Sequence, residues 1–377
     1  MRSIIKWFTV FAIGIILFCG LHPVQAQQIE NSLVVNSSMG KLATNAALEA
    51  FKTYAAKRWG LDINAGAVHG GGQMIYSKVI EWAGNPQADI MWGSDAWMFE
   101  ELGTKGLMSK LDLDKEVWES VPDSYGEPKP LGTKDPNKYW IGTSFVPWAV
   151  SYNPKLLKKL GVPPIKSWDD LVNPKLKGQV VSCTPDRSSS NHASVEAQLQ
   201  RLGEEKGWEF LKRMAANVHI FVARSSDVAS TVARGEAAVG FGTTGFGAFD
   251  LSKKGFDIKL AVVPYAYITP EPIGIVKNAK NPKAAKAFVQ FLLSAEGQRA
   301  LAETGCFPII KSFRVAGPEG SLLELGADLY GIRSFYDVPL YNVTDVILSK
   351  KRYQDVNQKF KEEILNVHKD LIKKYYP

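Results

Sequence analysis

Five short turns in this chain are rich in glycine and in hydroxyl side chains, and each lies between a strand-like and a helix-like segment. The first N–H groups of a helix have no partner within the helix, and the helix dipole is positive at that end. Small side chains let an oxyanion approach those groups, so each turn is a candidate anion site. The alternative is that each hydroxyl group only caps its helix. The turns are Ser37-Ser38, Gly70-Gly71-Gly72, Ser94-Asp95, Arg187-Ser188-Ser189-Ser190 and Thr243-Thr244.

Charged and polar side chains in or beside these turns could contact a ligand directly. The guanidinium of Arg187 suits bidentate binding of a phosphate or phosphonate, or it is a solvated surface group. His192, which follows Asn191 on the first turn of the next helix, could donate to an anion or pack locally. Asp95 could pair with a ligand amine or cap its own helix. We count Asp95, Arg187, Asn191 and His192 as candidate ligand-binding residues.

A further set of candidates lies where we expect the chain to cross back between two lobes. Tyr265, Tyr267 and Glu271 lie in this stretch, and Pro270 and Pro272 restrict the backbone around Glu271. A carboxylate in an exposed turn is the alternative interpretation of Glu271. We count Tyr265 and Glu271 as candidate ligand-binding residues, and Tyr265 with Tyr267 as metal ligands only if the ligand is ferric iron.

The segments that would position these turns alternate along the chain. Short apolar, β-branched runs alternate with longer segments of helical period, which is typical of an α/β fold. In an open α/β sheet, the strand ends that lead into helices share one edge, where ligands bind. The pattern occurs twice, so we predict a first lobe from residues 27–146 and 266–377 and a second lobe from residues 147–265.

The composition excludes several classes of protein. Of 377 residues, 45% are hydrophobic and 22% are charged, which predicts a globular protein with a sizeable core. The net charge is +7, but the basic residues are scattered, so we expect no nucleic-acid partner. Cys183 and Cys306 are predicted to be buried and unpaired, and no Cys/His spacing typical of a metal site occurs.

The amino-terminal segment has the pattern of a signal peptide. Arg2 and Lys6 precede an apolar run from Trp7 to Leu21, and small residues follow up to Ala26. The run is about 15 residues, which is shorter than a membrane-spanning helix needs. We therefore predict a signal peptide over residues 1–26, cleaved near Ala26, and an exported, periplasmic protein. The alternative is a retained amino-terminal anchor.

Four stretches resemble the solute-binding proteins of ABC importers, in the extracellular family 1 group that includes ferric-ion, thiamine and organophosphate binders. They are KSWDDLVNPKLKG (166–178), PQADIMWGS (86–94), VARGEAAVGF (232–241) and NPKAAKAF with LLSAEGQ (281–288 and 292–298). The resemblance implies the type II periplasmic-binding-protein fold: two lobes, each a mixed sheet flanked by helices, with a ligand cleft between them. It also implies a monomer without a cofactor that delivers a small solute to an ABC permease and its ATPase at the inner membrane.

The nature of the solute is argued from particular residues. Ferric binders of this group carry adjacent tyrosines after the strand that here ends in Gly242, but this chain has Thr243 and Thr244 there. The turn from Arg187 to His192 is more similar to the branch that binds organophosphates and phosphonates. We therefore expect a small anionic solute with a phosphate or phosphonate group, with ferric iron or a thiamine-type ligand as the alternatives.

A secreted hydrolase is the main rival class of function. It would use one of Ser188, Ser189 and Ser190 as a nucleophile with His192 as its base. No G-x-S-x-G elbow occurs in the chain, so we expect a binding protein and not an enzyme. A purely structural envelope protein is a third possibility, and it would have no deep cleft.

Overall fold

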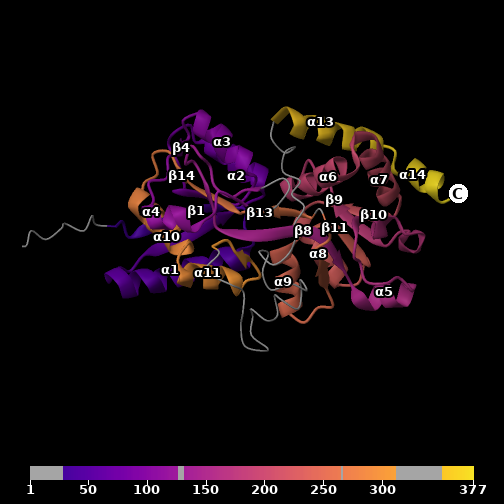
Figure 1. The fold of residues 1–377 in the computed structure, drawn as a ribbon, viewed down its shortest axis with the longest axis horizontal. Coiled ribbons are helices and arrows are strands. Elements are labelled where there is room, and N and C mark those ends of the chain that lie inside the picture. The colour runs from indigo at the N-terminus through magenta and orange to yellow at the C-terminus, as the bar shows by residue number, and fades with distance from the viewer. Residues whose placement is uncertain (1–28, 126–130, 265, 311–349) are drawn as a thin grey trace, which may run out of the picture.

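The computed structural model describes residues 29–125, 131–264, 266–310 and 350–377, which form two mixed sheets flanked by helices (Figure 1). We call each sheet with its helices a lobe. The α/β prediction with two mixed sheets is thus confirmed. No helix among the described residues is long and apolar enough to cross a membrane. The predicted signal peptide lies outside the described residues.

The first lobe is built on a mixed sheet: its first three strands are parallel, and β14 (Pro272–Val276) runs antiparallel to each strand that it pairs with. In spatial order its strands are β2 (Asn64–His69), β1 (Ser32–Ser37), β3 (Ile90–Trp92), β14 (Pro272–Val276) and β4 (Met108–Ser109), and β7 (Ile141–Gly142) also pairs with β14. Its helices are α1 (Lys41–Trp59), α2 (Gly72–Glu81), α3 (Ala96–Thr104), α4 (Lys115–Ser120), α10 (Pro282–Leu292) and α11 (Ala295–Ala302). A small hairpin, β5 (Ser124–Tyr125) with β6 (Leu131–Gly132), lies apart from the sheet.

The second lobe is built around β8, whose nine residues are buried except the last. In spatial order its strands are β10 (Val218–Val222), β9 (Val180–Cys183), β11 (Val239–Thr244), β8 (Ser144–Tyr152) and β12 (Lys259–Ala261), and β13 (Tyr267–Thr269) and β15 (Phe307–Pro308) also pair with β8. Its helices are α5 (Pro154–Leu160), the 3-10 turns η1 (Trp168–Val172) and η2 (Pro174–Leu176), α6 (Ser189–Leu202), α7 (Glu204–Ala216), α8 (Ser225–Ala233) and α9 (Gly245–Lys253).

Aromatic contacts fill the core of each lobe. In the first lobe, Phe51 of α1 packs against Phe288 and Phe291 of α10, with ring centroids 5.1 and 5.4 Å apart. In the second lobe, Trp168 packs edge-on against Phe241 of β11, at 5.5 Å. Burial of a large apolar side chain contributes about 2 kcal/mol, so these clusters fix where the helices lie on each sheet.

Two of the chain segments that cross between the lobes lie beside each other. The first runs from β7 to β8 through Thr143, and the second runs from β13 to β14 through Pro270 and Glu271. The N–H of Thr143 donates to the carbonyl of Pro270 (2.9 Å), and its hydroxyl donates to the carbonyl of Glu271 (2.9 Å). The crossings are therefore tied to each other where they pass between the sheets.

The C-terminal helices lie on the second lobe, which differs from the prediction that residues 266–377 belong to the first. Helix α13 (Lys350–Phe360), the π-helical segment η5 (Lys361–Leu365) and α14 (His368–Tyr375) run along α6 and α7 (Figure 1). Polar contacts hold them there: Glu363 pairs with Lys212 (2.6 Å), and Tyr375 donates to Glu209 (2.6 Å). The amphipathic pattern of this segment predicts helices, but it does not select the lobe that they cover.

Candidate functional site

The five helix starts singled out from the sequence come together where the two lobes meet. At one point, the start of α1 touches the start of α9: a Cβ atom added to Gly40 would lie 2.6 Å from the ring of Phe246. Phe246 in turn packs edge-on against Trp148 of β8, at 6.0 Å. Helix starts from opposite lobes are thus in van der Waals contact.

A second point of contact brings together the starts of α2, α3 and α6 around one tyrosine from α13. The ring of Tyr353 lies 4.3 Å from the ring of His192 on α6 and 6.2 Å from the ring of Trp97 on α3. Gln73, at the start of α2, is near enough to the hydroxyl of Tyr353 to lower its pKa. We call the five helix starts, together with Trp148, Tyr267 and Tyr353 between them, the interlobe interface.

Two hydroxyl groups in the predicted turns of the second lobe cap their own helices. Ser188 accepts a hydrogen bond from the N–H of Asn191 at the start of α6 (3.2 Å), and Thr244 accepts one from the N–H of Gly247 at the start of α9 (3.2 Å). The hydroxyl of Thr243 lies 2.7 Å from that of Ser151 on β8. For these residues the capping or packing alternative is what the contacts show.

The helix starts in the first lobe differ in this respect. Gly40, Gly71 and Asp95 are the N-cap residues of α1, α2 and α3, and none of these helices has a side-chain cap. Ser37 is fully buried and bonds instead to the hydroxyl of Thr44 (3.0 Å). The first N–H groups of these helices therefore have no side-chain acceptor of their own and can bind an external anion.

Ser38 and Ser94 lie in tight turns beside the second crossing. Gly93 has φ +84°, and a Cβ atom there would lie 2.6 Å from Ser38 Oγ and 3.3 Å from Glu271 Oε2. Ser94 also has a positive φ, +86°, and its hydroxyl points to the sulfur of Met98 (2.8 Å). Glycine at 93 thus allows the Ser38 turn to approach the carboxyl group of Glu271.

Three buried acidic groups lie at the interlobe interface. Burial raises the pKa of Asp95 to about 7, and the nearby hydroxyl of Tyr267 opposes this rise. Burial also raises the pKa of Glu271 to about 8. The hydrogen bond that Glu271 accepts from the hydroxyl of Thr269 (2.5 Å) lowers this pKa, and the charge of Asp95 raises it. The pKa of Tyr267 is raised well above its ordinary value, first by burial and then by these two carboxylates. Glu271 is therefore a buried group, not an exposed turn carboxylate.

Buried polar atoms without a hydrogen-bond partner concentrate at the same strand ends and helix starts. Each such atom costs about 1–3 kcal/mol, so natural proteins leave few of them. A ligand bound between the lobes would supply partners for groups of this kind. Among the described residues, these atoms include Asn36 Oδ1, His69 Nδ1, Asp95 Oδ2, Thr184 Oγ1, Asn191 Oδ1 and His192 Nε2.

The loop before α6 divides into exposed and buried positions. The side chain of Arg187 is exposed, so it is not enclosed by the lobes as they stand. Asn191 is fully buried and donates to Ser182 Oγ and to the carbonyl of Phe241, both at 3.3 Å. Burial lowers the pKa of His192 to about 4, so its imidazole is neutral. Ser189 and Ser190 begin α6, but their side chains and the whole of Tyr265 lie outside the described residues.

Several aromatic residues at the interface were not selected from the sequence. Trp97 and Phe246 each lie two residues after a predicted turn, at Asp95 and Thr244, and this spacing could have identified them. Trp148 donates from its Nε1 to the hydroxyl of Thr269 beside Glu271 (3.1 Å). No such spacing identifies Tyr353, because it lies far in the sequence from the five predicted turns.

In the described part of the chain, no three His, Cys, Asp or Glu side chains lie close enough together to hold a metal ion. Cys183 and Cys306 are buried free thiols. The high pKa of Tyr267 disfavours the phenolate form that a ferric ion would need.

Comparisons with known proteins are consistent with this geometry. Bacterial extracellular solute-binding proteins form a family whose sequence pattern matches residues 85–321. The phosphoglycerate transport regulatory protein PgtC of Salmonella typhimurium is 31% identical over 150 residues, which are 39% of this chain and only 37% of that protein. A periplasmic protein of Salmonella typhimurium named for binding of 2-aminoethylphosphonate is 25% identical over 249 residues, 63% of this chain and 66% of that protein.

One solved structure shows the same arrangement of lobes. The periplasmic binding protein AfuA from Actinobacillus pleuropneumoniae, with fructose-6-phosphate bound, superposes with a TM-score of 0.71. The superposition covers 89% of this chain and 99% of AfuA, at 21% sequence identity. At that identity the likeness shows the fold, which is that of type II periplasmic binding proteins.

Proposed function

The chain belongs to the family of bacterial extracellular solute-binding proteins, and from this premise we propose that it is the periplasmic binding component of an ABC importer. It binds a small anionic solute with a phosphate or phosphonate group between its two lobes and delivers it to a membrane permease and its ATPase. The observation that carries the proposal is the meeting of helix starts from both lobes, three of them without side-chain caps.

The chemistry of the interface supports an anion. Uncapped N–H groups and aligned helix dipoles favour a negatively charged group, and charge-assisted hydrogen bonds of this kind are stronger than neutral ones. The similar proteins described above are named for, or hold, compounds with a phosphate or phosphonate group. A hinge closure around the solute, through the crossings at Thr143 and Glu271, would bring the helix starts of both lobes onto it.

The residues also weigh against the alternatives. Thr243 and Thr244 stand where ferric binders of the group carry tyrosines, and Tyr267 is held as a neutral phenol. A hydrolase would need one of Ser188, Ser189 and Ser190 as its nucleophile, and of these the hydroxyl of Ser188 accepts the Asn191 N–H as a helix cap. A role in solute binding needs neither a nucleophilic serine nor a tyrosine phenolate.

The test is direct binding to the purified mature protein. Isothermal calorimetry and thermal unfolding would compare 3-phosphoglycerate, 2-aminoethylphosphonate, fructose 6-phosphate, inorganic phosphate, ferric citrate and thiamine. We expect at least one phosphate or phosphonate to bind, and at 100 times its Kd it should stabilise the protein by about 2.7 kcal/mol. The matching compound without its phosphate group should not bind. Binding of ferric citrate or thiamine alone would contradict the proposal.

A further inference from the structure

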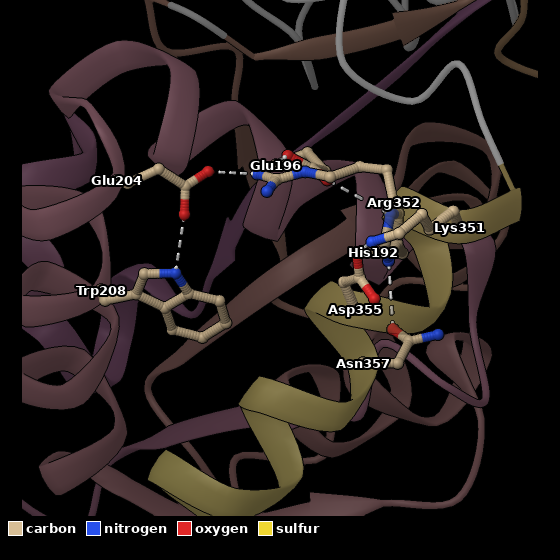
Figure 2. A network of polar contacts seen from close by, with 8 residues as sticks. All are labelled: His192, Glu196, Glu204, Trp208, Lys351, Arg352, Asp355 and Asn357. Carbon is tan, nitrogen blue, oxygen red and sulfur yellow. Dashed lines mark hydrogen bonds and ion pairs between the residues drawn. The ribbon is translucent and has the colours of Figure 1, made fainter.

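Helix α13 is anchored to the second lobe by a buried ion pair. Arg352 of α13 reaches across to Glu196 of α6, with Nε 2.7 Å from Oε1 and a terminal nitrogen 3.0 Å from Oε2 (Figure 2). Glu196 is fully buried, so its carboxylate depends on this guanidinium for compensation. Loss of one partner of a buried, hydrogen-bonded ion pair is strongly destabilising.

Further contacts fix the same helix in place. Arg352 also binds Glu204 at the start of α7 (2.5 Å), and Glu204 accepts a bond from Trp208 Nε1 (3.1 Å) (Figure 2). One turn further along α13, Asn357 Oδ1 lies 3.1 Å from Nδ1 of His192. Helix α13 is therefore part of the second lobe and should move with it.

Tyr353, the residue next to this anchor, reaches the other lobe. On the second-lobe side, its ring stacks on His192 at 4.3 Å and its hydroxyl donates to the carbonyl of Pro185 (3.2 Å). On the first-lobe side, its ring lies 6.2 Å from the ring of Trp97, and Gln73 is near enough to its hydroxyl to lower its pKa. One side chain thus bridges both lobes.

We propose that α13 is a strap fixed to the second lobe and that Tyr353 is a latch that holds the first lobe against it when the lobes are together. If the lobes separate, the contacts of Tyr353 with Trp97 and Gln73 break, while those of Arg352 with Glu196 remain. The latch should slow lobe opening and therefore solute release. Its effect on solute release rests on the proposed function, but its effect on lobe separation does not.

The experiment measures the distance between the lobes in solution. Nitroxide labels at Lys57→Cys on α1 and Lys158→Cys on α5 occupy exposed positions, one in each lobe, and the native Cys183 and Cys306 are buried. Pulsed electron resonance on ligand-free protein should show longer distances in Tyr353→Leu than in the parent. Tyr353→Phe keeps the ring contacts but loses the interaction of the hydroxyl with Gln73, so it should give an intermediate shift.

A matched control separates latching from general stability. Tyr375 of α14 also donates to a carboxylate, Glu209, but both residues belong to the second lobe. Tyr375→Leu should therefore leave the interlobe distance unchanged. The paired change Glu196→Gln with Arg352→Met removes the anchor without leaving a buried charge, and it should lengthen the distance as Tyr353→Leu does, in protein that still unfolds cooperatively.

The outcomes are distinguishable from those for the proposed function. With a solute from the panel above, Tyr353→Leu should raise the dissociation rate about tenfold, measured by stopped flow, while Tyr375→Leu should not. Unchanged distances in Tyr353→Leu would overturn the latch, whatever the protein binds. Longer distances in a protein that binds no phosphate or phosphonate would support the latch and contradict the proposed function.

Discussion

The helix starts of the two lobes face the same interface but are completed in different ways. In the second lobe, Ser188 and Thr244 cap α6 and α9 with their own hydroxyl groups. In the first lobe, α1, α2 and α3 begin at Gly40, Gly71 and Asp95 without a side-chain cap.

This difference indicates a division of roles. A capped helix start has already used part of its hydrogen-bonding capacity within the protein, whereas an uncapped start keeps its N–H groups available. The first lobe should therefore hold the charged group of the solute, and the second lobe should close over it. The predictions below are ordered from the largest expected effect to the smallest.

The strongest test removes one backbone N–H at a helix start in each lobe. Proline is tolerated at the first position of a helix but cannot donate, and the preceding residue is already extended at both Gly71 (ψ 159°) and Thr244 (ψ 141°). Gly72→Pro should weaken binding of the phosphate or phosphonate by about 2 kcal/mol, roughly 30-fold, because a charge-assisted bond is lost. Calorimetry would measure the change.

The matched variant in the second lobe is Gly245→Pro at the start of α9. We expect a much smaller loss of affinity, because Thr244 already caps this helix. Equal losses in the two variants would mean that the lobes share the anion evenly, and a larger loss in Gly245→Pro would reverse the assignment of roles.

The second prediction uses the titration of Asp95. Its pKa is raised to about 7 by burial, so the carboxyl is neutral at pH 6 and ionised at pH 8. An ionised Asp95 repels an anion at the start of α3, so affinity should fall as the pH rises from 6 to 8, by about 1.4 kcal/mol or tenfold. Glu271, with a pKa of about 8, faces the same cluster and should extend the fall to higher pH.

Asp95→Asn provides the control for this pH dependence. It should remove the part of the fall in affinity that is centred near pH 7, while the ionisation of the solute itself contributes equally in both proteins. It should also flatten the pH dependence of stability. A raised carboxyl pKa means that the folded state keeps a proton that the unfolded state loses, so this stabilisation is lost between about pH 4 and pH 7. An unchanged binding profile would exclude Asp95 from the anion's surroundings.

The smallest expected effects belong to the second-lobe caps. Ser188→Ala and Thr244→Ala should each lower the free energy of unfolding by about 1 kcal/mol, since a helix cap is lost. Their effect on affinity should be within a factor of three. A large loss of affinity without a loss of stability would show that these hydroxyl groups bind the solute instead of capping.

Much of the fold could be predicted because its signals are local. The run Ala88 to Trp92 has the apolar pattern of a strand, and the structure has β3 over Ile90–Trp92. The long apolar stretch 141–152 forms β7 and β8. Ser167 and Asp170 have the spacing of a capping box, and Asp170 accepts a bond from the Ser167 N–H (2.9 Å). Such elements are set by neighbours in the sequence.

The helix starts of the site could be located for the same reason, but their chemistry could not. Whether the hydroxyl of Ser188 or Thr244 caps a helix or faces a ligand depends on where the rest of the chain packs. Arg187 was interpreted as a ligand contact or a solvated surface group, and its side chain is exposed. Glu271 was interpreted as a ligand contact or an exposed turn carboxylate, and it is buried.

Long-range placement is what the sequence pattern lacks altogether. The period of residues 350–375 predicts amphipathic helices, but only tertiary contacts such as Arg352 with Glu196 show that they cover the second lobe. Tyr353 meets His192 across a long stretch of chain, and no local motif marks that meeting. The ligand-binding roles of the residues at the five helix starts stay predictions, which the experiments above test.

Strand β14 has a consequence for how the chain reaches its folded state. It lies inside the first sheet, between β3 and β4, although it follows strands β8 to β13 of the second lobe in the sequence. The amino-terminal half therefore lacks an interior strand until residues 272–276 have been synthesised, and pairing between such distant segments is slow. A nascent chain that cannot complete its first sheet early stays unfolded for longer. An unfolded chain is the form in which a polypeptide passes through a narrow secretion channel.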